Sequence, residues 1–299
     1  MDTTNALKTG VLLAALTGLL ILIGAIVGGT AGVIVALVFG VAMNGAAYWF
    51  SDRLALSMAR ARPVSPDEAP RLHAQVRDLA ALAGIPTPAV YLIDDPSPNA
   101  FATGRDPAHA AVAVTTGILD LLDARELRGV LAHEFAHSRN RDILLTTVAA
   151  AIAGAISAIA NVFHLAALFG GHDEAEEGHG LLGSLALLVV APIAATLIQL
   201  AVSRSREYAA DATGAALSGD PLALAAALGK LERGAWLRPM AVNPAAAPLF
   251  IVHPFGGGGV LKLFSTHPPA AERIARLQAM AGAGRSRPHP AISCSSGGE

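Results

Sequence analysis

The sequence His-Glu-Phe-Ala-His at positions 133–137 has the residue types and the spacing of a zinc-binding helix. Residues four apart on a helix project from the same face, so His133 and His137 can bind one tetrahedral Zn²⁺. Glu134 is offset around the helix and can reach a water on the metal without being a ligand itself. The predicted chemistry is therefore hydrolysis by a metal-activated water, with Glu134 as the catalytic base.

The helix that carries this motif has a recognisable start. Asp123 followed by Glu126 forms a capping-box sequence, which puts carboxylates near the positive end of the helix. Apolar residues then recur at helical spacing up to Phe135. We expect the two histidines to lie on a regular helix.

A catalytic zinc site needs a third protein ligand and leaves a fourth position for water. Glu207 is our candidate, because it begins a predicted helix in the stretch 203–211. Asp211 lies four residues further and shares the same face. We expect Asp211 to accept the free ring N–H of a zinc-bound histidine and so to fix its tautomer.

The composition indicates a membrane protein. The chain is 53% hydrophobic and 15% charged, with a mean hydropathy of +0.51, whereas soluble domains carry about 25% charged residues. Residues 9–51 carry no charge and suit two spans, at 10–28 and 32–50, joined by a tight turn at 28–30. A cleaved signal peptide is the rival interpretation of the first span, although its apolar run is long for one.

Two further spans are expected at 143–168 and 181–202, separated by a short acidic loop at 171–180. Arginines follow the second span at positions 53, 60 and 62, and the fourth at 204 and 206. By the positive-inside rule, both termini and the long segments are cytoplasmic. The net charge of −2 gives no basic excess for a nucleic-acid partner, and Cys294 alone cannot form an internal disulfide.

The cytoplasmic part is predicted to combine helices with a small sheet. A helix should run from Ser65 to about Leu82, and strands should form at 89–93, 99–104 and 110–115. A protease needs an edge strand to hold an extended peptide, and 111–115 is our candidate, with Ala111, Ala113 and Thr115 as substrate-binding residues. A strand buried inside its own sheet fits the same pattern.

The predicted fold is therefore a mainly α membrane protein, with four transmembrane helices and a cytoplasmic α+β zinc metalloprotease domain. The chain divides into two transmembrane helices (1–51), a cytoplasmic part with the zinc-binding helix (52–142), two further transmembrane helices (143–202), a cytoplasmic part with the third ligand (203–284) and a disordered tail (285–299).

These motifs together resemble the HtpX family of membrane-embedded zinc endopeptidases, which is related to the CAAX prenyl proteases. The likeness covers nearly the whole chain to about Leu277 and is carried by His133–His137 with Asn140 and Asp142, by 203–211, by Pro98–Gly104 and by Ser265–Pro269. The resemblance implies one zinc ion per chain, an active site on the cytoplasmic side of the inner (plasma) membrane, and unfolded membrane proteins as substrates. Within these motifs, we expect His267, at the start of the last helix, to donate to the oxyanion, and Asn99 either to position the substrate or to make a turn.

Two other functions fit parts of this pattern. A CAAX-type processing protease would use the same zinc chemistry, although four spans do not suggest a chamber for a lipid. A catalytically silent zinc-stabilised scaffold would need the histidines but not Glu134. Roles for His164, for His253 and for a second metal in the 171–180 loop stay open.

Overall fold

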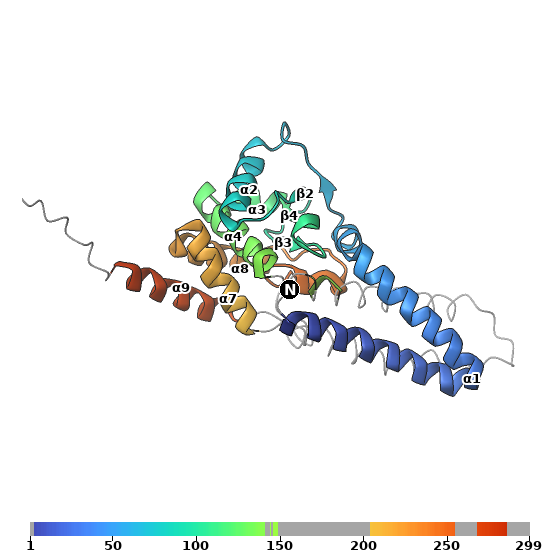
Figure 1. Cartoon of the computed structure of the whole chain (residues 1–299). Helices are drawn as coiled ribbons and strands as arrows, with labels where there is room; N and C mark the ends of the chain where they lie inside the picture. The colour runs from blue at the N-terminus through green and yellow to red at the C-terminus, as the bar shows by residue number, and fades with distance from the viewer. Residues whose placement is uncertain (1–2, 141–143, 145, 149–203, 255–267, 286–299) are drawn as a thin grey trace, which may run out of the picture.

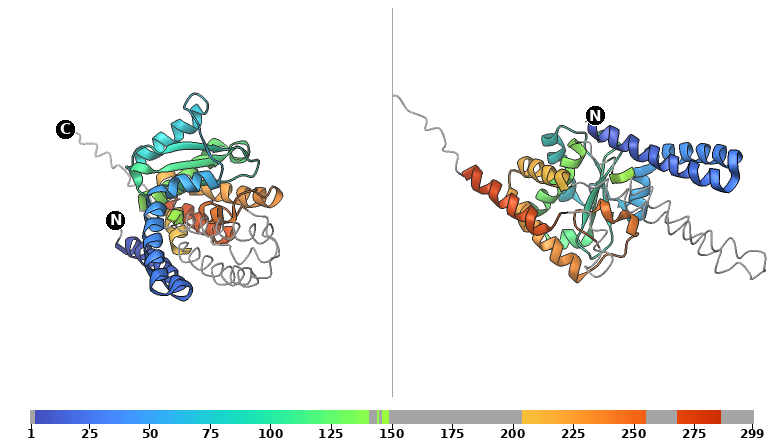
Figure 2. Two further views of the ribbon diagram at one scale, coloured as in Figure 1. Left: turned by 90° about the vertical axis from the view of Figure 1, so that its right-hand side faces the viewer. Right: turned by 90° about the horizontal axis from the view of Figure 1, so that it is seen from below.

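In the computed structural model, the described residues are 3–140, 144, 146–148, 204–254 and 268–285. The expected third and fourth spans, the acidic loop, His164, His267 and the tail after residue 285 lie outside these ranges. The helical hairpin α1 (Thr3–Met58) extends from one side of the globular part, and the last helix, α9 (Ala270–Arg285), extends from the opposite side (Figure 1, Figure 2).

The first 56 described residues form a helical hairpin, α1 (Thr3–Met58), with two arms that lie side by side (Figure 1). Gly29 breaks the helix with φ 55° and ψ −137°, a left-handed conformation that favours glycine. The arms touch closely at Gly24 and Gly32, where a Cβ on Gly24 would lie 2.4 Å from the carbonyl oxygen of Gly32. The turn lies within the expected positions 28–30. Of the described residues, the window Gly29–Ala46 is long and apolar enough to cross a bilayer.

A four-stranded sheet lies beyond the hairpin, in the order β1-β2-β4-β3. Its strands are β1 (Arg62–Pro63), β2 (Ala89–Ile93), β3 (Ala100–Thr103) and β4 (Ala111–Thr115). β4 runs parallel to β2 and antiparallel to β3. The strands expected at 89–93, 99–104 and 110–115 are therefore confirmed, with small shifts in their ends.

The expectation that residues 111–115 form an edge strand is wrong. Each of these residues pairs with β2 on one side, and four of them pair with β3 on the other. All five are buried, and Ala111 and Ala113 pack against the end of α1 and the 246–250 segment. Ala111, Ala113 and Thr115 therefore have no open edge for a peptide, whereas β3 is the outer strand on this side of the described sheet.

Helix α2 (Pro70–Ala83) begins later than predicted. Ser65 accepts a hydrogen bond from the backbone N–H of Glu68 at 3.3 Å, but this contact closes a turn before the helix. Pro70 occupies the first helical turn, where its missing N–H costs nothing. The end is as expected, because Gly84 adopts a left-handed conformation (φ 69°) and its N–H caps the last turn.

Four further helices follow, α3 (Thr116–Leu121), which was not predicted, α4 (Ala124–Asn140), α7 (Arg204–Ser218) and α8 (Pro221–Leu237). α3 and α4 contact the sheet, and α7 and α8 pack against α4. The main core lies between β2, β4 and helices α2, α4 and α8, and includes Leu79, Val114, Phe135 and Leu228. A second cluster covers the other face, where Phe101 of β3 meets Phe250 edge to face at 5.1 Å.

Candidate metal centre

Helix α4 is fixed at its start and held against α8. The backbone N–H of Glu126 donates to Asp123 at 2.9 Å, and the N–H of Asp123 donates to the Glu126 carboxylate at 2.9 Å. This is the predicted capping box. Lys230 of α8 also contacts the Glu126 carboxylate at 2.7 Å, so one side chain caps α4 and joins it to α8. The start of α4 is therefore tied to α8.

Helix α7 brings Glu207 to the two histidines. The Nε2 atoms of His133 and His137 lie 3.3 Å apart, and Glu207 oxygens lie 3.8 Å and 3.7 Å from them. The close approach depends on Gly214, because a Cβ there would lie 2.8 Å from the backbone N and Cα of His133. Glu207, the third ligand predicted from the sequence, thus meets His133 and His137 where the backbones of α7 and α4 lie in close contact at Gly214.

The three side chains fit a zinc ion. Their ligand atoms all lie within 4.8 Å of one another. Bonds of about 2.0–2.1 Å in a tetrahedral site separate neighbouring ligand atoms by about 3.3 Å, close to the distances found between His133, His137 and Glu207. Two imidazoles and one carboxylate with an open fourth position form a ligand set of catalytic zinc sites.

Asp211 contacts Nδ1 of His133, the ring nitrogen that is not directed to the metal site. Its Oδ1 lies 3.0 Å from Nδ1 of the imidazole, so the Nδ1–H donates to the carboxylate and Nε2 is directed to the metal site. Burial lowers the pKa of His133, and the adjacent Arg273 guanidinium lowers it further. The ring is therefore neutral, as a metal ligand must be. Although burial alone would raise the pKa of Asp211, hydrogen bonds from His133 and Arg273 hold it well below its usual range.

Glu134 is buried beside the ligands and reaches strand β3. Its Oε2 accepts a hydrogen bond from the backbone N–H of Ala102 at 2.8 Å. Burial raises the pKa of Glu134 to about 8; nearby His137 lowers it and the Glu207 carboxylate raises it further. A buried carboxyl next to a candidate metal site, with a pKa shifted toward neutrality, is a candidate general base.

Asn99 is engaged within the chain. Its side chain is buried, its Nδ2 donates to the carbonyl of Val252 at 2.9 Å, and its Oδ1 accepts from the Val252 N–H at 3.4 Å. The N–H of Ile251 also donates to the Ala100 carbonyl at 3.0 Å. Residues 251–252 therefore lie along the outer edge of β3 at its start. The predicted contact between Asn99 and substrate would require this segment to move.

Sequence reasoning missed Arg273 of α9, whose side chain is fully buried at the metal centre. Its Nε and Nη2 donate to the two Asp211 oxygens at 2.9 Å and 2.7 Å, and its Nη1 lies 3.8 Å from Glu207. A signal was available in the sequence, because Arg273 shares a helix face with Leu277, which is also buried. An arginine on the apolar face of a helix needs a buried acidic partner.

Comparison with known proteins agrees with this site. Residues 66–281 match the sequence pattern of peptidase family M48. The chain is 55% identical to a protease HtpX homolog of Persephonella marina over 281 residues, covering 93% of this chain and 98% of that protein. It is 52% identical to a protease HtpX homolog of Ralstonia nicotianae over 283 residues, covering 94% and 98%.

Among solved structures, the crystal structure of S. mikatae Ste24p is similar, with a TM-score of 0.49 and 20% identity over 92% of this chain and 65% of that one. The family match spans both halves of the metal centre, from the helix with His133 to the helix with Arg273. The chain therefore belongs to peptidase family M48, as a metalloprotease of the HtpX type.

Proposed function

We propose that this metalloprotease is a zinc endopeptidase embedded in the inner (plasma) membrane, which hydrolyses peptide bonds of misfolded or damaged membrane proteins. The observation that carries the proposal is the cluster of His133, His137 and Glu207 beside the buried carboxylate of Glu134. A His₂Glu ligand set with a neighbouring carboxylate that is not a ligand is characteristic of zinc peptidases.

The residues of the site divide the work of hydrolysis. A Zn²⁺ ion held by His133, His137 and Glu207 supplies, when bound, a water of lowered pKa and a Lewis acid for the scissile carbonyl. Glu134 accepts the proton of the attacking water and delivers it to the nitrogen of the leaving amine. Asp211 keeps the His133 ring in one tautomer. His267, which lies outside the described residues, is proposed to donate a hydrogen bond to the oxyanion.

The outer edge of β3 is the proposed binding site for an extended substrate. The Thr115 N–H donates to the Asn99 carbonyl at 3.0 Å. In this register the backbone N–H and C=O groups of odd-numbered β3 residues bond to β4, and those of even-numbered residues point to the open edge of the sheet. Ala102 is one of the outward residues and contacts Glu134 directly. Because residues 251–252 cover the start of β3 and Glu134 holds the Ala102 N–H, we propose that an extended peptide donates to the Ala102 carbonyl, next to the catalytic carboxylate.

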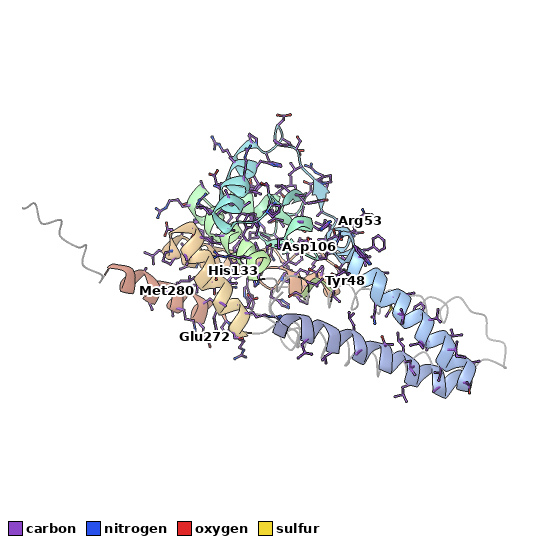
Figure 3. All side chains as sticks on the ribbon, viewed as in Figure 1. Tyr48, Arg53, Asp106, His133, Glu272 and Met280 are labelled. Carbon is purple, nitrogen blue, oxygen red and sulfur yellow. The ribbon has the colours of Figure 1, made fainter. Side chains whose placement is uncertain are left out.

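The α1 hairpin supports insertion into a bilayer. Its apolar residues are largely exposed, including Val35, Val38 and Trp49, and such a surface is unstable in water. Figure 3 shows Tyr48 and Arg53 where the second arm joins the globular part. Aromatic residues followed by arginines are typical of the cytoplasmic membrane interface. We propose that both termini and the metal centre are cytoplasmic, and that the stretch 143–202 adds two further spans.

The test is cleavage by the purified protein in detergent. Two substrates are compared, an unfolded protein and a prenylated CAAX peptide, each with chelator and after zinc is restored. The proposal expects zinc-dependent cleavage of the unfolded protein. Cleavage of the prenylated peptide alone would assign the CAAX processing function instead. One bound zinc per chain without cleavage of either substrate would assign the scaffold function.

A further inference from the structure

The guanidinium of Arg273 is held by three parts of the chain at once. It forms the two-point contact with Asp211 of α7, its Nη2 lies 3.3 Å from both ring nitrogens of His133, and its Nη1 donates to the carbonyl of Ile251 at 3.3 Å. Ile251 is the residue whose N–H binds Ala100 on the outer edge of β3. Arg273 therefore touches the metal-binding helices and the segment that covers part of the substrate strand.

A buried guanidinium is costly unless its donors are satisfied, so this arrangement requires an explanation. The buried acidic groups near it are Glu134, Glu207 and Asp211. A divalent cation on the ligands and one guanidinium together balance the charge of three ionised carboxylates. A lysine could provide the same charge, but only an arginine presents parallel N–H groups to both oxygens of a carboxylate.

We propose that Arg273 is a positioning residue of the metal centre, which fixes the Asp211 carboxylate so that Asp211 holds Nδ1 of His133 and leaves Nε2 for the metal. Asp211 Oδ1 is shared, because it accepts from Arg273 at 2.7 Å and from His133 at 3.0 Å. Without the guanidinium, the carboxylate could rotate away from the imidazole. This inference rests on the proposed zinc site and extends it to the last helix.

Two surface contacts keep α9 where Arg273 can act. The Tyr208 hydroxyl of α7 donates to Glu272 at 2.5 Å, and the Arg276 guanidinium stacks 3.9 Å above the Tyr208 ring. Figure 3 shows Glu272 at the outside of this helix pair, whereas His133 lies inside. Glu272 and Arg276 flank Arg273 on α9, so docking of this helix on α7 delivers the guanidinium to Asp211.

The experiment compares Arg273→Lys and Arg273→Gln with a matched control, Arg77→Lys, at an exposed position of α2. Zinc affinity is measured by competition with a chromogenic chelator, and the visible spectrum of the Co²⁺-substituted protein reports ligand geometry. Thermal unfolding of each metal-free variant shows whether it is folded. Asp211→Asn and Asp211→Asn/Arg273→Lys complete a double-mutant cycle.

Loss of an outer hydrogen-bond partner of a metal ligand typically weakens metal binding by about 10–100-fold. We expect Arg273→Lys to weaken zinc binding about 10-fold and to alter the Co²⁺ spectrum, although it keeps the charge. Arg77→Lys should leave both unchanged. Because Arg273 acts through Asp211, Arg273→Lys should add little loss to Asp211→Asn. Wild-type affinity and spectrum in folded Arg273→Lys, or losses that simply add in the cycle, would overturn the proposal.

A second measurement separates this inference from the proposed function. Wild-type protein that takes up no zinc would overturn the zinc site itself. The imidazole ¹⁵N shifts of His133 in the metal-free protein would still test Arg273, because they report which ring nitrogen carries the proton. We expect Nδ1 protonation in the wild type and a mixture of tautomers in Arg273→Lys. Identical shifts in the two proteins would show that Arg273 does not position the ring.

Discussion

The Glu134 carboxylate accepts a hydrogen bond from the backbone N–H of Ala102 at 2.8 Å. This contact joins the helix of the metal ligands to the outer strand of the sheet. It places the proposed base and the proposed peptide-binding edge within one hydrogen bond of each other. Residues 32 positions apart in the sequence thereby meet at the proposed reaction site.

Glu134→Gln should abolish most peptide cleavage and keep the metal. Glutamine preserves the shape of the side chain but cannot accept the proton of the attacking water as a carboxylate does. We expect turnover to fall by about 10²- to 10⁴-fold, with zinc content unchanged. The matched control is Glu126→Gln on the same helix, which keeps an acceptor for the Asp123 N–H but loses the ion pair with Lys230, so it should lower stability by about 1 kcal/mol or less and leave turnover intact. Wild-type turnover in Glu134→Gln would remove Glu134 as the base.

The stability of the metal-free protein should depend on pH through Glu134. Its pKa is raised from 4.5 to about 8 in the folded protein, so between these values the folded state binds a proton that the unfolded state has lost. Stability contributed by this group therefore falls as the pH rises from about 5 to 8.

Glu134→Gln removes this titration. In chelator-treated protein, we expect the variant to unfold at a higher temperature than the wild type at pH 8, by an amount equivalent to a few kcal/mol, roughly, and to differ much less at pH 5. The comparison is a pair of thermal unfolding curves at each pH. A difference between the two proteins that is the same at both pH values would contradict the raised pKa.

Glu207→Ala should release most of the bound metal, since two imidazoles make an incomplete site. The loss in zinc affinity should exceed the approximately 10–100-fold that an outer partner contributes. Glu232→Ala, at an exposed position of α8, serves as the control and should bind zinc as the wild type does. Full zinc occupancy in Glu207→Ala would mean that another residue is the third ligand, and His253 would then be the first to test.

Gly214→Ala should separate α7 from α4 at the metal centre. A Cβ at position 214 would lie 2.8 Å from backbone atoms of His133, so a helix must move. We expect a loss of about 1–3 kcal/mol in stability together with weaker zinc binding, because Glu207 moves with α7. Gly229→Ala is the control, since its Cβ would meet side-chain atoms at no less than 3.5 Å. Equal zinc affinity in both variants would show that the helix contact does not set the ligand distances.

Topology can be tested with reporters. The arginines after the second arm of α1 predict that a reporter fused after Arg62 is cytoplasmic. Reporters inserted at Gly29, in the turn of the hairpin, and at Gly178 should register as outside. A cytoplasmic signal at Gly29 would contradict insertion of the hairpin, and one at Gly178 would contradict the two later spans alone.

The sequence predicted those parts of the site that depend on local spacing. His133 and His137 share a helix face by periodicity alone, and Asp123 with Glu126 marked the start of that helix. Glu207 followed from the need for a third ligand. The edge strand was wrong because alternation of small apolar residues is the same in an inner strand and an outer one. Arg273 was missed because its spacing from Leu277 marks it only as buried, and its partner, Asp211, lies 62 residues away with no local pattern to link them.

The residues of the metal centre are spread along the chain in the order in which it is synthesised: His133 and His137, then Glu207 and Asp211, and finally Arg273. A nascent chain that has only completed α4 carries two imidazoles and Glu134 but no third ligand. The ribosome must add about seventy further residues before Glu207 exists, and more than sixty again before α9 can deliver its guanidinium. On the proposed mechanism, the metal centre is therefore complete only after α9 has been synthesised, which protects the growing chain and its neighbours from premature cutting up to that point.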